Sequence, residues 1–189
     1  MRRPIIAIAL LLGCASAGAL ERYLIDTEGM HAAIEFRIQH LGYSWLSGRF
    51  NTFSGWFEFD PALVGSKVEV LIDTRSIDSN HAERDEHLQG VDFLDVTRFP
   101  EARFVGTRVE AGEGGRFALH GDLTLHGVTR AVVIDAREIG SGADPWGGFR
   151  RGFDGSTTLK LADFGIDFDL GPAAREVQLR LSVEGVRQP

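Results

Sequence analysis

Hydrophobic and polar residues alternate along most of the chain after residue 20. The first clear case is Ile34, Phe36 and Ile38, which are separated by Glu35 and Arg37. An alternation of period two places apolar side chains on one face of an extended segment and polar side chains on the other, as in antiparallel strands with one buried face. About eight such segments follow one another, which predicts an all-β domain built as a sandwich or a barrel.

The alternation stops in residues 76–99. Within this stretch Asn80 is followed by Glu83 in the arrangement of a helix N-cap with Glu at the third helical position. We therefore expect a short helix, inserted around residues 80–95, whose regular part runs to about Gln89. Its position after several strands places it as an insertion in the β-domain.

Residues 1–19 have the layout of a secretory signal peptide, in which a pair of arginines precedes a short apolar run and a tail of small residues. We expect cleavage after Ala19, which leaves residues 20–189 as the mature domain and places it in the periplasm. This cleavage removes Cys14, the sole cysteine, and with it any disulfide or thiolate metal site. The alternative is a lipoprotein that is anchored through a lipidated Cys14.

The composition narrows the classes of partner. A chain of 189 residues is long enough for one domain with a sizeable core. Its 27 acidic residues exceed its 20 basic ones, for a net charge of -7, and no Lys/Arg cluster compensates locally. A nucleic-acid partner is therefore excluded from the interpretation. With 23 glycines the chain suits many tight turns, and residues 126–129, His-Gly-Val-Thr, predict a hairpin turn.

The inward faces of the predicted strands are rich in large apolar residues, among them several of the 13 phenylalanines. Such a lining suits a hydrocarbon chain in a barrel interior, because phenylalanine offers no hydrogen bond. Periodicity alone fits a filled core as well, and both interpretations stay open at this point. The residues that alternation places inside are Ile34, Phe36, Ile38, His40, Phe53, Phe57, Phe59, Val68, Val70, Ile72, Phe104, Phe117, Leu119, Leu123, Ile134, Phe153, Leu179 and Leu181.

Four residues of the inserted helix are of metal-ligating types: His81, Glu83, Asp85 and His87. On a regular helix the two histidines lie about 240° apart, so they cannot share one ion. We interpret these residues as a solvated helix surface and expect no metal site. The chain also lacks the Gly-x-Ser-x-Gly elbow and the glycine-rich phosphate loops, so no catalytic residue is assigned.

A polar loop follows the middle strands, at residues 144–148. It contains Trp146 and is followed by Arg151, which together could hold a ring or an anionic head group by stacking and charge. They are our candidates for the entrance of a ligand cavity. The alternative is a loop that pairs its own Asp144 with an arginine.

Six blocks of the sequence, in this order, resemble the YceI-like family of periplasmic, lipocalin-like proteins. They are HAAIEFRIQHLGYSWLSGRFNTFSGWFEFD, NHAERDEHL, DFLDVTRFPEARF, GDLTLHGVTR, DPWGGFRRGF and LGPAAREVQLRLSVEGV, and they cover nearly everything from Tyr23 to the C-terminus. The resemblance implies an extended eight-stranded antiparallel barrel with a helix near one end and an elongated apolar cavity. It also implies a polyisoprenoid, isoprenoid quinone or fatty-acyl ligand, and it permits a cytochrome-b-type membrane protein as partner and a homodimer.

The resulting functional hypothesis is a periplasmic binding or carrier protein that holds one long apolar tail, with no resident cofactor. One alternative is a quinone-linked redox accessory or enzyme acting on the bound isoprenoid. His40 is the candidate for that chemistry, because it shares the inward face of Ile38. The other alternative is a structural barrel with a filled core.

Overall fold

The structure is a computed structural model that describes residues 20–63 and 65–189. The predicted signal peptide, with Cys14, lies outside the described residues. The strands are β1 (Glu21–Ile25), β2 (Ala33–His40), β3 (Ser44–Phe50), β4 (Phe53–Phe59), β5 (Lys67–Asp73), β6 (Ile77–Asp78), β7 (Glu101–Ala111), β8 (Arg116–Leu125), β9 (Val128–Ala143), β10 (Phe149–Lys160) and β11 (Glu176–Arg187). The α-helix is α1 (Ala82–Gln89), and the short 3₁₀ helices are η1 (Thr74–Ser76), η2 (Glu113–Gly115), η3 (Leu161–Phe164) and η4 (Pro172–Ala174). Within the described residues, none of these helices has the length and apolar character needed to cross a bilayer.

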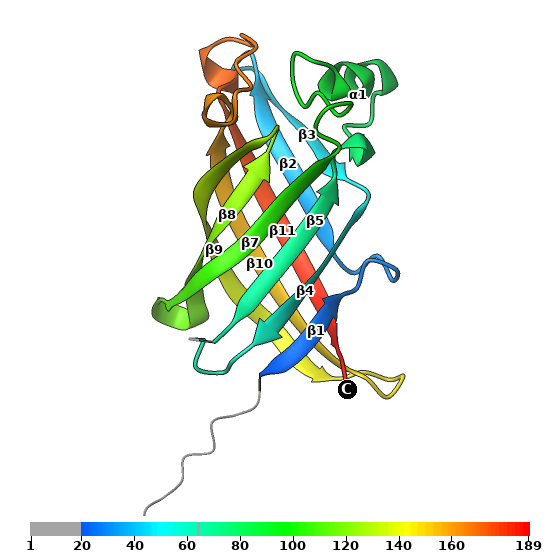
Figure 1. Cartoon of the computed structure of the whole chain (residues 1–189), viewed down its shortest axis with the longest axis vertical. Helices are drawn as coiled ribbons and strands as arrows, with labels where there is room; N and C mark the ends of the chain where they lie inside the picture. Colours follow the sequence, from blue (N-terminus) through cyan, green and yellow to red (C-terminus); the bar gives the residue numbers. More distant parts are fainter. Residues whose placement is uncertain (1–19, 64) are drawn as a thin grey trace, which may run out of the picture.

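The strands form one antiparallel sheet that closes into a barrel (Figure 1). Around the wall the order is β1-β4-β5-β7-β8-β9-β10-β11, and pairing of β1 with β11 closes the ring. β2 continues the line of β1, since it pairs with the first half of β11 and β1 pairs with the last residues. β3 leads into β4 in the same way. The wall is therefore an eight-stranded antiparallel barrel with one short α-helix, which confirms the predicted fold.

The two ends of the barrel differ. At the terminus end, where β1 begins and β11 finishes, β4 pairs with β5 and the wall is continuous. Toward the opposite end the neighbouring strand changes. There Arg49 and Phe50 of β3 pair with the two-residue strand β6, whereas β4 pairs with β5. The insertion of η1, β6 and α1 lies beside it (Figure 1). We call this the helix end.

Helix α1 begins one residue later than the sequence pattern predicts. Its N-cap is His81, whose Nδ1 accepts a hydrogen bond from the backbone N–H of Arg84 at 3.3 Å, while Asn80 adopts a positive φ of 62°. Every residue of the helix is at least partly exposed. Polar contacts hold it instead: the backbone N–H of Ser79 donates to Asp85 at 2.8 Å, and Arg84 donates to the Ser79 carbonyl at 2.5 Å.

The hairpin turn predicted between β8 and β9 is confirmed. Leu125 pairs with Val128, and the two residues between them have positive φ, 51° at His126 and 73° at Gly127. Two consecutive positive φ angles are those of a type I′ turn, whose twist matches that of paired strands.

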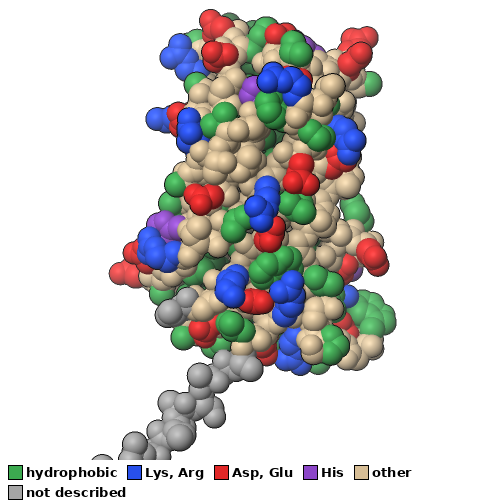
Figure 2. Space-filling model, in the orientation of Figure 1, with side chains coloured by type: hydrophobic (Ala, Val, Ile, Leu, Met, Phe, Trp, Pro, Cys, Tyr) green, Lys and Arg blue, Asp and Glu red, His purple; other side chains and the backbone are tan. Residues whose placement is uncertain are grey.

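Apolar side chains line the inside of the barrel, and charged side chains lie on its outside. Figure 2 shows Lys, Arg, Asp and Glu spread over the face in view. The buried apolar residues form three clusters along the barrel. Their members include Tyr23, Phe57 and Phe59 in the first, Phe104, Leu123 and Ile134 in the second, and Phe36, Phe93 and Ile166 in the third.

Candidate ligand cavity

Among the described residues, two apolar cavities lie inside the barrel. The one toward the helix end has a volume of about 360 Å³, and the one toward the terminus end has about 170 Å³. The larger cavity alone falls in the range of about 300–1,000 Å³ that small-molecule sites occupy. Ile34, Ile72, Leu123 and Leu179 line both cavities, so the two meet at these side chains, which we call the waist.

Each residue that alternation places inside lines one of the cavities or the waist. Phe36, Ile38 and His40 line the helix-end cavity. The terminus-end cavity takes Phe53, Phe57, Phe59, Val68, Val70, Phe104, Phe117, Leu119, Ile134, Phe153 and Leu181. The remaining four form the waist. The inward position of all these residues follows from the alternation of apolar and polar side chains along the paired strands. Their contact with a ligand stays a prediction.

Part of the helix-end cavity is lined by residues from segments outside the long strands. The alternation in the sequence does not predict these residues as cavity lining. Leu88, Phe93 and Leu94 reach it from the insertion around α1, and Ile166 and Leu170 reach it from the segment between β10 and β11. These residues follow no period of two, so alternation cannot assign them to a face. The one sequence signal for these cavity residues is that they are large apolar residues in otherwise polar, irregular segments.

Polar side chains join the lining of the helix-end cavity. They are Gln39 and His40 at the end of β2, and Arg84 and His87 on α1. The Arg84 Nε donates to the Ser79 hydroxyl at 2.7 Å, and His87 Nε2 lies 3.3 Å from the Asp92 carboxylate. This end therefore presents imidazole and guanidinium groups beside an apolar chamber.

The helix residues of metal-ligating types make separate contacts. His81 caps α1, Asp85 binds Ser79, and His87 faces the helix-end cavity. The structure does not bring them together around one point.

Aromatic rings pack across the barrel at the terminus end. Tyr23, which is fully buried, stacks on Phe57 with ring centroids 4.8 Å apart, and Phe57 meets Phe153 edge to face at 5.4 Å. Burial is the main cause that raises the pKa of the Tyr23 hydroxyl. Arg151 covers this cluster, because its guanidinium lies 3.7 Å from the ring centroid of Phe59.

Arg151 is thus a closing group rather than an obvious entrance. Its side chain is 12% exposed and pairs with Glu138 at 2.7 Å. Neither Arg151 nor Trp146 is among the described residues that line the two cavities. Their role at an entrance stays a prediction that this geometry does not favour.

The loop between β9 and β10 pairs its own charges, as the alternative interpretation states. The Asp144 carboxylate accepts hydrogen bonds from Arg150 Nε at 2.9 Å and from the backbone N–H of Gly148 at 2.7 Å. The hydrogen bond from Gly148 is the main cause that lowers the pKa of Asp144. Trp146 is 76% exposed, with the Arg150 guanidinium 5.3 Å from its ring centroid.

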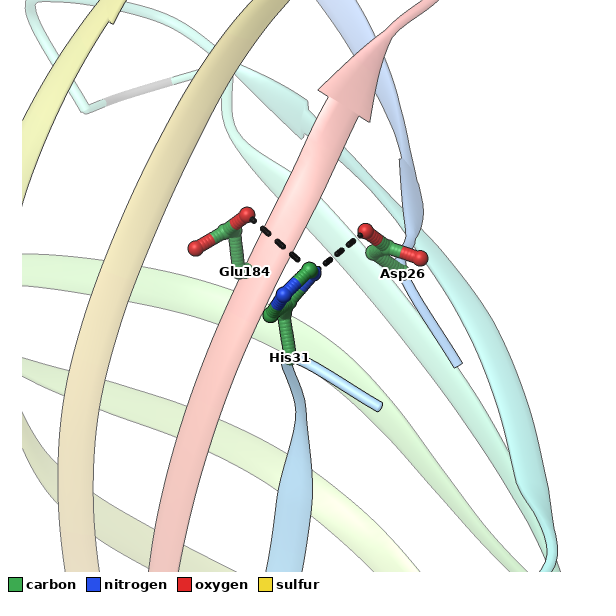
Figure 3. A group of neighbouring side chains, drawn as sticks. All are labelled: Asp26, His31 and Glu184. Atoms are coloured by element: carbon green, nitrogen blue, oxygen red, sulfur yellow. Dashed lines mark hydrogen bonds and ion pairs between the residues drawn. The ribbon is translucent and has the colours of Figure 1, made fainter. Parts of the chain in front are cut away.

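Asp26, His31 and Glu184 form a cluster on the outer wall, where β1 gives way to β2 beside β11 (Figure 3). His31 Nδ1 lies 3.0 Å from Asp26 and 3.9 Å from Glu184. Arg150 Nη1 donates to both carboxylates, at 2.6 Å and 2.5 Å. Hydrogen bonds from His31 and then Arg150 hold the Asp26 pKa well below its usual range. Because the Arg150 guanidinium already donates to both carboxylates, the cluster fits an ion-pair network better than a cation site.

Comparison with known proteins agrees with this architecture. The model of the YceI-like domain family matches residues 23–185. A UPF0312 protein of Pseudomonas aeruginosa (strain LESB58) is 55% identical over 191 residues, and the match covers 100% of each chain. Burkholderia cenocepacia BcnA has a TM-score of 0.74 at 23% identity, over 85% of this chain and 98% of BcnA. A polyisoprenoid-binding domain from Saccharophagus degradans, implicated in plant cell wall breakdown, has a TM-score of 0.65 at 14% identity, over 88% of this chain and 98% of that domain.

The two solved structures share the barrel fold with this chain. The family match begins at Tyr23 in β1 and ends at Gly185 in β11, so it spans the strands that close the barrel as well as the cavities between them. The chain therefore belongs to the YceI-like family.

Proposed function

We propose that this chain is a periplasmic carrier that holds the long apolar tail of an amphiphile inside its barrel. The tail is that of a polyisoprenoid, an isoprenoid quinone or a fatty acid. The observation that carries the proposal is the pair of apolar cavities that meet at the waist. Protein interiors are normally packed to the density of organic crystals. A cavity of about 360 Å³ beside a second of about 170 Å³ therefore supports an occupant rather than a filled core.

The driving force would be the burial of hydrocarbon. Each methylene that leaves water contributes about 0.8 kcal/mol, so a tail of several isoprene units can be held mainly by its length. The waist favours a slender, flexible tail, because Ile34, Leu123 and Leu179 stand between the two cavities. The role is binding and carriage rather than turnover of a bound quinone.

The setting of this carrier is also part of the proposal. The signal-peptide pattern of residues 1–19 supports export to the periplasm. The fold shared with the Saccharophagus degradans domain supports polyisoprenoids among the tails. A cytochrome-b-type membrane partner and a homodimer follow from the family resemblance alone and stay predictions.

The proposal is tested by filling the cavity. Ile134 lines the terminus-end cavity and is 7% exposed, while its neighbour Val133 is 48% exposed on the outer wall. Ile134→Trp should weaken binding of long tails, and Val133→Trp should leave it unchanged. Affinity is measured by calorimetry for saturated fatty acids from decanoate to stearate and for prenyl quinones of increasing tail length.

In the wild-type protein we expect affinity to rise with tail length by at most about 0.8 kcal/mol per methylene. In Ile134→Trp the rise should stop at a shorter tail. Ala136→Leu, a smaller change in the same cavity, repeats the test if the tryptophan disturbs folding. Binding that is independent of tail length, or equally strong in the inward and outward variants, would refute the carrier.

A further inference from the structure

The two ends of the cavity system offer different chemistry to a ligand. At the helix end the lining includes His40, Arg84 and His87, which come from β2 and α1. Imidazole and guanidinium groups carry N–H donors, and the two bonds from Arg84 to Ser79 use two of the five on its guanidinium. His40 is exposed, and His87 Nε2 already lies 3.3 Å from the Asp92 carboxylate. These groups therefore place hydrogen-bond donors at the edge of an otherwise apolar chamber.

The terminus end has its charged groups turned outward. Glu58 and Lys67 touch the terminus-end cavity, but they pair with each other at 3.2 Å, and Glu58 also pairs with Arg22 at 3.1 Å. Asp154 pairs with Arg137 on the outer wall. The space itself ends on aromatic rings, including Phe57, Phe59 and Phe153. Ser66 and Thr157 also belong to this lining, but its accessible surface is almost wholly apolar, more so than at the helix end. A polar head group placed here would lose its water against that surface.

Exposed apolar side chains surround the helix end. Leu41, which also lines the cavity, is 56% exposed, and Tyr43 in the same turn is 87% exposed. Phe168, in the segment between β10 and β11, is 44% exposed and packs on Phe93 and His87, with ring centroids 5.1 Å and 5.6 Å away. An amphiphile that enters here meets apolar surface before it reaches the chamber.

We infer that the bound amphiphile has one orientation: its oxygen-bearing head group lies at the helix end between His40, Arg84 and His87, and its tail passes the waist toward the aromatic terminus end. The head group belongs to the class of hydrogen-bond acceptors, such as a carboxylate or a quinone carbonyl. This inference rests on the proposed function, since it presupposes that the cavity holds a tail.

The orientation is tested directly with stearate that carries a nitroxide at one of two places. Backbone amide signals of the mature protein are recorded by NMR with 5-doxyl stearate and with 16-doxyl stearate. We expect the 5-doxyl probe to broaden the signals of Gln39–Leu41 and α1, and the 16-doxyl probe to broaden those of Phe59 and Phe153. A reversed or identical pattern for the two probes overturns the inference while leaving the carrier intact. If neither probe binds, the proposed function fails and this inference fails with it.

The donors are tested by the double variant His40→Leu/His87→Leu, which keeps apolar volume and removes both imidazoles. The control is His120→Leu, because His120 lies on the outer wall beside Arg108. We expect the double variant to bind stearate about five- to tenfold more weakly, as for the loss of one or two hydrogen bonds. The gain in affinity per added methylene should stay as in the wild type.

A second arm uses a prenyl quinone in place of stearate. A similar loss for both ligands identifies the shared oxygen acceptor as the recognised group, and a loss for one alone restricts the site to a carboxylate or to a carbonyl. Unchanged affinity for both ligands in the double variant overturns the inference.

Discussion

At the scale of single residues, glycines opposite phenylalanines shape the inner wall of the barrel. A Cβ added at Gly121 would lie 2.3 Å from Phe104 Cζ, and one added at Gly48 would lie 2.4 Å from Phe36 Cζ. Each ring therefore rests in the space that the glycine leaves on the neighbouring strand. Rings held against the wall in this way leave volume along the barrel axis.

This contact predicts the effect of Gly121→Ala. The new methyl group must displace Phe104, so we expect the free energy of unfolding to fall by about 1–3 kcal/mol, as for other overpacked cores. Gly140→Ala is the matched control, because within the described residues a Cβ there meets no atom within 4 Å. Urea denaturation measures both. An equal effect of the two variants would contradict the packing argument.

The Asp26 network predicts a dependence of stability on pH. Because the Asp26 pKa is lowered by folding, its contribution is complete above the unfolded-state pKa of about 4 and is lost as the pH falls toward the folded value. Asp26→Asn should therefore be less stable than the wild type at pH 7, and the gap should narrow below about pH 4. Urea midpoints across this range measure the gap. Asp122→Asn removes one carboxylate from the exposed outer wall as the control, and a gap for Asp26→Asn that is constant with pH would argue against the network.

At the scale of elements, the five-residue strand β1 closes the barrel. It pairs with β4 on one side and β11 on the other, and its central residue, Tyr23, is fully buried. The Tyr23 hydroxyl donates to Glu21 at 2.6 Å, and the ring stacks on Phe57. One fully buried side chain therefore anchors the strand that closes the barrel.

Tyr23→Ala should lower the free energy of unfolding by about 3–5 kcal/mol, as for the truncation of other buried aromatic residues. Tyr23→Phe keeps the ring and should cost much less. Leu24→Ala is the control, since Leu24 is 46% exposed on the other face of β1. Thermal and urea denaturation of the three variants provide the comparison, and a small effect of Tyr23→Ala would show that β1 is dispensable for closure.

The elements that sequence alone predicts are those with a regular period or a local signal. The alternation from Ile34 to Ile38 shows which face of β2 points inward, and the Gly127 turn follows from its local residues. The pairing of β3 with β6, where β4 pairs with β5, has no such signal. It depends on contacts between segments that are distant in the sequence. The cap of α1 also shifts to His81, where the imidazole meets the Arg84 N–H.

The candidate site divides in the same way. Residues of the wall could be assigned from their period, but Phe93 and Ile166 could not, since they reach the cavity from irregular segments. The sequence predicts an entrance at Arg151, because the chemistry of this residue suits a head group. Its ion pair with Glu138 and its contact with Phe59 depend on tertiary packing, which the sequence does not display.

At the scale of the whole molecule, the barrel is a tube with unlike ends. Aromatic rings and Arg151 pack across the terminus end, and donors of the insertion and of β2 line the helix end. The waist at Ile34 and Leu179 divides the space between them. Such a molecule is suited to a ligand with one polar head and one long tail.

The most direct measurement is native mass spectrometry of the mature protein purified from its own periplasm, followed by organic extraction. We predict a stoichiometric added mass that extraction identifies as a prenyl, quinone or acyl species. The same spectrum shows whether the chain starts at Leu20 or carries a lipid on Cys14. A mass of the protein alone, with no uptake of added prenyl quinones or fatty acids, would contradict the carrier and leave a structural barrel.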